Sequence, residues 1–343
     1  MREVAKAAKV HVTTVSLALR NSPQLPEATR QRIQALAKKL GYRTNPLVAA
    51  FVQQRRISHP TKYQGLLGFI THSTESVRTL PDNVYIVEMF RAAEAHAREV
   101  GFRLEPFEAR DYGLNAARLE RALHARGVRG LILPPTEDRD GEIVQLNWDH
   151  FSCVTLSTSI HRPLMDRVVT DHFGGARMAV RTAWERGYRR PGYFSLASTD
   201  ERTQGRWRGG FLAEAQSLGL EKEVPVLVAE DVGMREAFRR WYLRWKPDVL
   251  ISIGLTFDTC LPVLDELGVS SPEDVGLIEL NLHTRRGEFS GVDPSVSAMS
   301  RIGVEMLVSK LYRNESGLSR HPQVSMHPPV WHEGRTLPAR VPA

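Results

Sequence analysis

Apolar residues recur at helical spacing in three short segments at the start of the chain. The pattern predicts helices over residues 2–9, 12–20 and about 27–40, with Pro26 opening the third helix and Gly41 ending it. A tight turn separates the first two helices. Three short helices around a small core are therefore expected. The residues that we expect to face inward are Val4, Ala5, Ala8, Val15, Ala18, Leu19, Ile33, Leu36, Ala37 and Leu40.

From Tyr63 onward the pattern changes to apolar runs that alternate with amphipathic helices. Such alternation implies parallel sheets with helices on both faces. The segment 63–343 is too long for one such sheet, so we expect two lobes. Strands are expected at 65–70, 102–107, 130–135, 153–157, 168–170, 192–196, 224–229, 249–253, 275–280 and 324–327. Helices are expected at 84–100, 115–126, 174–187, 205–218, 233–245, 258–267 and 298–313.

Charge is spread unevenly along this chain. Residues 1–62 hold twelve Lys and Arg against two acids, whereas the whole chain has 46 basic and 39 acidic residues. The part after residue 62 is therefore slightly acidic. A basic head on such a body indicates a polyanionic partner for the head alone. On charge alone, a solvated basic arm is an equal alternative.

Composition narrows the class of protein. The apolar fraction of 42% and the charged fraction of 25% are typical of a globular protein with a full core. No stretch approaches ~20 uninterrupted apolar residues, so we expect no membrane partner. The start of the chain has no apolar core of a secretion signal. Cys153 and Cys260 are far apart in the sequence, which suggests reduced thiols in a cytoplasmic protein.

Sequence motifs of catalysis do not occur. The chain has no G-x-S-x-G, no G-x-x-x-x-G-K-[ST], no H-E-x-x-H and no G-x-G-x-x-G. His321, His327 and His332 are irregularly spaced among prolines, which favours solvated or structural histidines over a metal site. We therefore expect a protein that is not an enzyme, with no catalytic residue, no metal and no cofactor.

Two short helices with a tight turn, and a third helix packed across them, form the helix-turn-helix plan. The second helix would enter the major groove of DNA, which is wide enough to admit it. Hydroxyl side chains can bond phosphates or base edges there, and apolar side chains can cover thymine methyl groups. The residues that we expect to contact DNA from this helix are His11, Val12, Thr13, Thr14, Ser16, Leu17 and Arg20.

Several residues at fixed offsets in this head resemble the lactose/galactose repressor family. The matching segments are Val4-Ala5, Ala8-Lys9-Val10, Thr14-Val15-Ser16, Asn21, Thr29-Arg30, Leu40-Gly41-Tyr42 and Asn45-Pro46. The resemblance covers the head and continues more loosely across nearly the whole chain. It implies that Val12, Thr13 and Leu17 read bases. The family often has polar or basic residues there, so this chain is expected to read its site partly through thymine methyl groups.

The start of the chain departs from this pattern. The first helix of the family usually begins with Thr and has an acid three residues later, which forms a capping box. Glu3 fits the acid, but its Thr partner would precede Met1. We therefore expect the native chain to begin a few residues earlier.

The segment after Tyr42 resembles the hinge helix of the family. In the family, a pair of these helices lies in the minor groove, and an apolar side chain wedges between base pairs and kinks the DNA. The wedge position here is Phe51, although packing of Phe51 on the body remains an alternative. The resemblance places Asn45, Val48 and Phe51 on DNA, with Arg55 and Arg56 near phosphates.

The body resembles, through the same family, a periplasmic sugar-binding protein with two lobes that three segments cross. This implies a head over 1–43, a hinge and linker over 44–62, and an effector-binding and dimerisation domain over 63–343. Asp171 is expected to cap a helix rather than to bind ligand. We place the first lobe at about 63–159 and 288–319, and the second at about 160–287 and 320–343.

The resemblance puts the effector in the cleft between the lobes, at the carboxyl ends of parallel strands. Sugar-binding members use an Arg and two Asp residues at positions that fall here on Trp207, near 254–255 and near 280–281. Their loss argues against a simple neutral sugar. Trp207 and Phe257 can stack on an apolar ligand face. The candidate effector-binding residues are Thr71, His72, Ser73, Tyr85, Arg206, Trp207, Phe257 and Asn281.

The sequence therefore predicts a bacterial repressor that binds a palindromic DNA operator as a homodimer. A small-molecule effector, carbohydrate-like or a related metabolite, would control it from the cleft. The alternative is a cytoplasmic protein that senses a small molecule without binding specific DNA. The basic head argues against this alternative.

Overall fold

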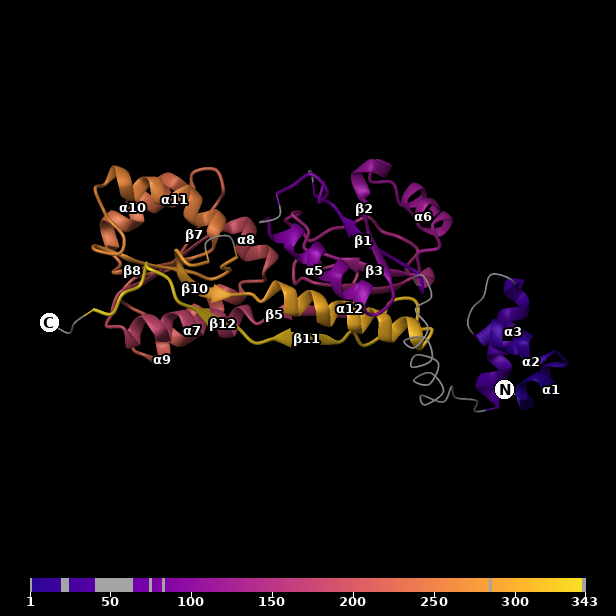
Figure 1. Ribbon diagram of the computed structural model, residues 1–343. Coiled ribbons are helices and arrows are strands. Elements are labelled where there is room, and N and C mark those ends of the chain that lie inside the picture. The colour runs from indigo at the N-terminus through magenta and orange to yellow at the C-terminus, as the bar shows by residue number, and fades with distance from the viewer. Residues whose placement is uncertain are drawn as a thin grey trace.

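The computed structural model describes residues 2–19, 25–40, 64–73, 76–81, 84–283 and 286–340. Figure 1 shows a small helical head and two α/β lobes. The fold class predicted from the sequence, a helix-turn-helix head with a two-lobed body, is confirmed. No helix in the described ranges is long and apolar enough to cross a membrane.

The head consists of α1 (Arg2–Ala8), α2 (Val12–Leu19) and α3 (Glu27–Lys39). Its core is small, and most of the residues predicted to face inward form it. Leu40 is an exception, since it is 49% exposed just after the end of α3. Leu19 and Leu36 pack on the core while remaining partly exposed. The buried members are Val4, Ala5, Ala8, Val15, Ala18, Ile33 and Ala37.

The first lobe contains a six-stranded sheet in the order β11-β5-β4-β3-β1-β2, and all its pairings are parallel. Apolar clusters cover both faces of the sheet, as parallel sheets require. The strands are β1 (Leu66–Thr71), β2 (Arg103–Glu108), β3 (Gly130–Leu133), β4 (Ser152–Thr155), β5 (Arg167–Thr170) and β11 (Val324–His327). The helices are α5 (Tyr85–Glu99), α6 (Ala116–Ala125), α12 (Val296–Tyr312), η1 (Ala109–Tyr112) and η2 (Trp148–His150).

The second lobe has a sheet in the order β12-β10-β9-β8-β6-β7, with only β12 antiparallel to its neighbour. Two apolar clusters again pack on it. Its strands are β6 (Pro191–Leu196), β7 (Leu227–Ala229), β8 (Val249–Ser252), β9 (Gly276–Glu279), β10 (Ser290–Asp293) and β12 (Val330–His332). Its helices are α7 (His172–Glu185), α8 (Ala197–Arg202), α9 (Arg206–Ser217), α10 (Met234–Trp245) and α11 (Gly254–Glu266).

The predicted lobe boundaries need correction. We placed crossings at 159–160, 287–288 and 319–320, but β5 and β11 pair within the first sheet and β10 pairs within the second. The chain therefore crosses after Thr170, between Asp293 and Val296, and between His327 and Val330. Each crossing lies several residues later than predicted. The apolar runs show that strands exist, but the sheet that a strand joins depends on its tertiary partners.

The strand and helix predictions in the body match the structure except for five elements. We missed β10, β12, α8 and the two short 3-10 helices η1 and η2. β10 reads Ser-Gly-Val-Asp and β12 has three residues, so neither gives a recognisable apolar run. α8 reads Ala-Ser-Thr-Asp-Glu-Arg and has no apolar periodicity. The missed α8 matters most, because it contributes to the cleft described below.

Two local predictions hold. The side chain of Asp171 caps α7 by accepting a hydrogen bond from the Gly174 N–H at 2.8 Å, as the sequence suggested. Cys153 and Cys260 are both buried and free, so neither forms a disulfide. Burial raises the pKa of the Cys153 thiol well above its usual value, so this thiol stays protonated.

Candidate functional site

The first candidate site is the exposed side of α2 in the head. Val15 and Ala18 are fully buried against α1 and α3, so the opposite side of α2 faces outward. His11 is exposed just before α2 begins, and Thr14 and Leu17 are partly exposed on it. Val12 is also partly exposed but packs in part on the head core. These four residues are therefore accessible to a partner along one helix.

The other DNA-contact candidates are not placed by the structure. Thr13 and Ser16 belong to α2, but their side chains are not described. Six further candidates lie outside the described residues, so their assignment stays a prediction from the sequence. These are Arg20, Asn45, Val48, Phe51, Arg55 and Arg56.

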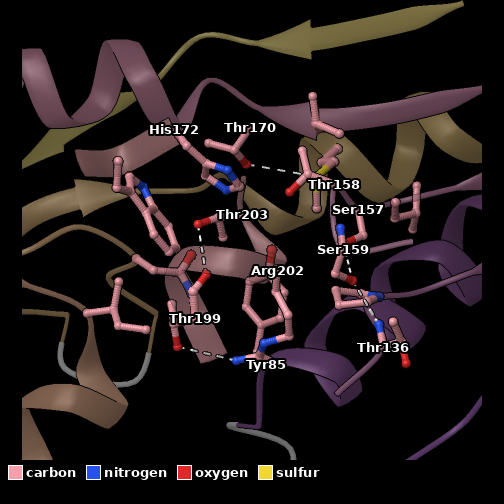
Figure 2. A pocket seen from close by; sticks show the side chains of 17 residues that line it. Tyr85, Thr136, Ser157, Thr158, Ser159, Thr170, His172, Thr199, Arg202 and Thr203 are labelled. Atoms are coloured by element: carbon pink, nitrogen blue, oxygen red, sulfur yellow. Dashed lines mark hydrogen bonds between the residues drawn. The ribbon is translucent and has the colours of Figure 1, made fainter. Parts of the chain in front are cut away.

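The second candidate site is a cavity of about 180 Å³ between the lobes. Side chains from both lobes point into it, as Figure 2 shows. The first lobe contributes the segments that follow β3 and β4, the end of β5, the start of α5 and one residue of α12. The second lobe contributes α8, the starts of α7 and α9, and the segments that follow β8 and β9. The cavity thus lies where the carboxyl ends of parallel strands meet, the usual ligand position in such sheets.

Eight of the seventeen residues that line the cavity carry a hydroxyl group, and aromatic and apolar side chains make up much of the rest of the wall. Among the described residues that line it there is one guanidinium, and no carboxylate. The polar lining residues are Tyr85, Thr136, Ser157, Thr158, Ser159, Thr170, His172, Thr199, Arg202, Thr203 and Asn281. The apolar lining residues are Pro135, Leu156, Val169, Trp207, Ile253 and Met299.

His172 and Trp207 form the aromatic part of the wall. Their ring centroids are 4.4 Å apart and the rings are tilted by 52°. Burial, with a smaller contribution from the charge of Arg206, lowers the pKa of His172 to about 4. The imidazole is therefore neutral at physiological pH. Its Nδ1 is buried and has no hydrogen-bond partner among the described atoms.

Three of the eight effector-binding candidates line the cavity: Tyr85, Trp207 and Asn281. Burial, together with Glu88 and Asp293, raises the pKa of Tyr85, so its hydroxyl stays protonated and can donate a hydrogen bond. Trp207 is only 5% exposed and offers a ring to the cavity. These three remain our candidates for contact with a ligand.

Phe257 was placed wrongly by the sequence argument. It is completely buried in the core of the second lobe, in edge-to-face contact with Phe194 at 5.3 Å and with Phe289 at 5.6 Å. α11 begins at Gly254, so Phe257 lies one turn inside the helix on the side that faces the sheet. It therefore does not reach the cavity.

The end of β1 also lies away from the cavity. Thr71 is buried, and His72 Nε2 accepts a hydrogen bond from the Val144 N–H at 3.1 Å. Burial, with Arg110 contributing, lowers the pKa of His72 to about 4. Ser73 donates to Glu137 at 3.2 Å. His72 and Ser73 thus bind the loop after β3, Thr71 is buried at the end of β1, and none of the three lines the cavity.

Arg206 lies close to the cavity without lining it. It begins α9, and its guanidinium donates to Gln204 Oε1 at 3.2 Å. Its charge is near enough to contribute to the lowered pKa of His172, which does line the cavity. Arg206 is therefore part of the electrostatic environment of the cleft.

Sequence reasoning missed most of the hydroxyl groups and Arg202. Ser157 ends the strand predicted at 153–157 and Thr158 and Ser159 follow it, so this Ser-Thr-Ser run was a readable signal of a polar strand end. Arg202 could not be found in this way, because α8 itself was not predicted. Which strand ends face the cleft depends on the order of strands in each sheet.

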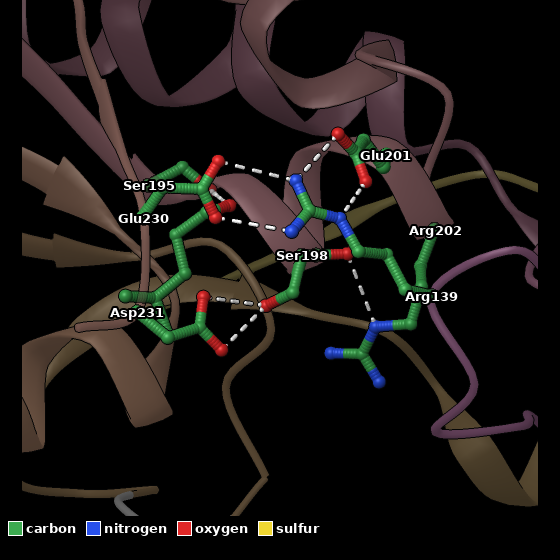
Figure 3. A network of polar contacts seen from close by, with 8 residues as sticks. Arg139, Ser195, Ser198, Glu201, Arg202, Glu230 and Asp231 are labelled. Atoms are coloured by element: carbon green, nitrogen blue, oxygen red, sulfur yellow. Dashed lines mark hydrogen bonds and ion pairs between the residues drawn. The ribbon is translucent and has the colours of Figure 1, made fainter.

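An ion-pair clasp joins the lobes beside the cavity (Figure 3). Arg139, from the loop after β3, donates to Glu201 at 2.8 Å and to Glu230 at 3.0 Å, and both acids belong to the second lobe. Hydrogen bonds to these two carboxylates raise the pKa of Arg139 further above its already high value. Arg286 of the second lobe also approaches Glu88 of α5, at 3.5 Å. Ion pairs at two places thus join the lobes.

Replacing Arg139 by Ala should shift the lobes toward an open arrangement. The ratio of open to closed molecules should rise about two- to fivefold, because exposed ion pairs contribute stabilisation of that size. Small-angle scattering of the full-length protein should show a larger radius of gyration for Arg139→Ala than for wild type at low salt. Salt should reduce the difference, since it screens the wild-type pair. Arg301→Ala removes an exposed pair within α12 and is the control. Identical scattering from all three proteins would show that the clasp does not set the lobe arrangement.

Comparison with known proteins gives two family matches. The model described as "Bacterial regulatory proteins, lacI family" matches residues 1–45, and the model described as "Periplasmic binding protein-like domain" matches residues 180–337. The curated relatives include the HTH-type transcriptional repressor PurR of Pectobacterium atrosepticum. It is 25% identical over 296 residues, covering 81% of this chain and 79% of the relative. PurR of Escherichia coli O1:K1 / APEC is also 25% identical, over 287 residues and with the same coverage.

Solved structures share the fold. A complex of the transcriptional regulator CelR with cellobiose has a TM-score of 0.59 at 19% identity and covers 97% of this chain and 98% of its own. A lac repressor dimer bound to operator and the anti-inducer ONPF has a TM-score of 0.58 at 16% identity, with 98% of each chain covered. A regulator from Enterococcus faecium with bound ribose has a TM-score of 0.61 at 13% identity, covering 80% of this chain and all of its own.

Proposed function

The chain belongs to the lacI family of bacterial regulatory proteins, and from this we propose that it is a transcriptional repressor controlled by a small-molecule effector. The observation that carries the proposal is the combination of head and cleft in one chain. A helix-turn-helix head with an accessible second helix precedes a two-lobed body, and the body encloses a cavity lined by both hydroxyl-bearing and apolar side chains. The protein is a regulator and not an enzyme.

The head is the part that binds double-stranded DNA. Residues 1–62 carry twelve basic and two acidic residues, a charge that supports contacts with phosphates. His11, Val12, Thr14 and Leu17 lie on the accessible side of α2, from which base edges are read in the major groove. Thr13, Ser16, Arg20 and the hinge residues Asn45, Val48, Phe51, Arg55 and Arg56 complete the proposed DNA contacts.

The operator is palindromic and the repressor binds it as a dimer. A homodimer places two identical heads on two half-sites, so the symmetry of the site mirrors that of the protein. The structure of the lac repressor dimer bound to operator, which shares this fold, supports the arrangement. The proposed place of action is the bacterial cytoplasm, at the nucleoid.

The effector lies in the interlobe cavity, where Tyr85, Trp207 and Asn281 contact it. Binding there changes DNA affinity only through the difference between the effector's affinities for the two lobe arrangements. The clasp of Arg139 with Glu201 and Glu230 stabilises one of these arrangements. Cellobiose and ribose are bound by regulators of the same fold, which supports a small polar metabolite here.

The test is selection of genomic fragments by the full-length protein at physiological salt, followed by sequencing. We expect enrichment of a short palindrome, and the genes beside it would indicate the class of the effector. The alternative function, a sensor without specific DNA binding, is favoured if no fragment is enriched over random sequence with or without added metabolites. A selection repeated with a head-disrupted variant is the control, and it should recover no palindrome.

A further inference from the structure

The guanidinium of Arg202 lines the cavity, and its hydrogen bonds within the protein are weak. Its Nε donates to the Ser198 carbonyl at 3.3 Å and its Nη2 to Thr199 Oγ1 at 3.4 Å. Both distances are longer than the 2.7–2.9 Å that is typical of charge-assisted hydrogen bonds. Figure 3 shows no carboxylate bonded to this guanidinium. Burial lowers the pKa of Arg202, although Glu137 and Asp231 act in the opposite direction.

The acids close to Arg202 are already bound by other side chains. Asp200 pairs with Arg208 at 2.9 Å, and Glu201 binds Arg139 at 2.8 Å. Asp231 accepts from the Ser198 hydroxyl with both oxygens. The positive charge of Arg202 at the cavity is therefore not neutralised by a hydrogen-bonded acid of its own.

Two further arginines add positive charge beside the cleft. Arg167 is 8% exposed and its Nη2 donates to the Ile160 carbonyl at 3.3 Å. Burial and then the charge of Arg206 lower the pKa of Arg167. The Nε of Arg206 is buried and has no partner among the described atoms. Arg167 is buried and Arg206 is partly buried, and a buried cation beside a like charge is costly unless an anion accompanies it.

The rest of the cavity wall favours a ligand that accepts hydrogen bonds. The Thr158 hydroxyl can donate, the buried phenol of Tyr85 stays protonated, and no described lining residue is a carboxylate that could accept from sugar hydroxyls. We propose that the effector carries a carboxylate or phosphate group that binds Arg202 in this cleft, with the rest of the molecule against Trp207. The inference rests on the proposed function, because it names the chemical class of the effector for the same site.

Inorganic phosphate and three related metabolites test this proposal on the full-length protein. Inorganic phosphate should raise the melting temperature of the wild-type protein more than sodium chloride does at equal ionic strength. In titration calorimetry, ribose 5-phosphate or ribonate should bind about ten- to a hundredfold more tightly than ribose, the range expected for hydrogen bonds to a charged group. The two acidic probes distinguish a phosphate from a carboxylate effector.

Arg202→Gln should remove both the phosphate effect and the preference for the acidic probe. Arg240→Gln is the matched control, since its side chain is 71% exposed on α10 and does not line the cavity. Melting of Arg202→Gln without added anion checks that it folds. No stabilisation of wild type beyond that given by chloride, or ribose binding as tightly as both acidic probes, would overturn the proposal. Genomic selection on the same preparations shows separately whether the repressor function itself holds.

A second inference comes from a cluster on the surface of the first lobe. Glu120 and His124 are one turn apart on α6, and His150 ends η2 beside them. Their ligand atoms lie within 4.8 Å of one another. His124 stacks on Phe151, with ring centroids 5.3 Å apart and an interplanar angle of 18°. Glu120 Oε1 accepts from the Asn147 N–H, which leaves its other oxygen available.

The chemistry of this cluster matches a transition-metal site. Zn²⁺ binds imidazole nitrogens and carboxylate oxygens at about 2.0–2.2 Å in a tetrahedron, with donors roughly 3.4 Å apart. Both histidines are exposed, so their side chains can rotate to close the remaining distance. We infer that Glu120, His124 and His150 bind one Zn²⁺ per chain, with water as the fourth ligand. The sequence pointed to no metal site, because these residues are separated along the chain.

Equilibrium dialysis of the full-length protein against Zn²⁺, followed by elemental analysis, measures this site directly. Wild type should retain one ion, and Co²⁺ in its place should give the intense visible absorption of tetrahedral coordination. His124→Gln and His150→Gln should each weaken binding by about tenfold or more, since even groups that only orient metal ligands have effects of this size. His321→Gln, an exposed histidine elsewhere, is the control. Equal retention by all four proteins, or none by wild type, would contradict the site.

Discussion

Replacing Val15 by Asp should abolish specific DNA binding while both lobes stay folded. Val15 is fully buried among the few apolar side chains that hold α1, α2 and α3 together. An unpaired carboxylate at this position costs several kcal/mol, which is about the whole free energy of unfolding of a small three-helix domain. Anisotropy with a selected operator should show a loss of at least about a hundredfold, and the body should melt as in wild type.

Gln31→Asp is the matched control for Val15→Asp. It adds the same negative charge to the head at an exposed position of α3, where the Gln31 side chain bonds Glu27. Gln31→Asp should weaken operator binding only modestly, through the added negative charge. Wild-type operator affinity for Val15→Asp would mean that the three-helix head does not bind the DNA.

Replacing Lys310 by Ala should be the most damaging single change to the first lobe. Lys310 of α12 forms a buried ion pair with Asp166, the residue before β5, and these residues are 5% and 7% exposed. Asp166 also accepts from the Gln323 N–H at 2.8 Å, so it joins α12 to the segment that leads to β11. Removing the cation leaves a buried carboxylate unpaired, which destabilises a protein by about 3–5 kcal/mol.

Guanidinium unfolding monitored by fluorescence measures this loss. The double variant Lys310→Met with Asp166→Asn removes both charges but keeps an acceptor for Gln323, so it should recover most of the stability. If Lys310→Ala unfolds at the same midpoint as wild type, the pair is not the link that holds α12 in place. Any loss of operator binding by Lys310→Ala should be proportional to the fraction of this variant that is unfolded.

The sequence predicted the elements and the class of the fold, because periodicity and apolar runs are local properties. Residues such as Val15 and Ile33 could be assigned to the head core from spacing alone. Lobe membership was harder, since whether β5 or β10 joins the first or second sheet depends on partners far away in the chain. The crossings were therefore predicted too early.

The cleft was predicted only in part, for the same physical reason. Tyr85, Trp207 and Asn281 follow or begin recognisable elements and do line the cavity. Phe257 has an aromatic ring that could stack on a ligand, but its position near the start of α11 directs the ring into the core. Arg202 lies on a polar helix that no sequence pattern marks. Neighbours in space, which the sequence does not display, decide which side chains meet.

The most direct test of the central claim is a comparison of two duplexes by fluorescence anisotropy at one physiological salt concentration. The full-length protein is titrated with the palindrome recovered from genomic selection and with a scrambled duplex of equal length and composition. The repressor account predicts binding of the palindrome at least about a thousandfold more tightly than the scrambled duplex. Equal affinities for the two duplexes would contradict it and would leave a basic head that holds DNA through charge alone.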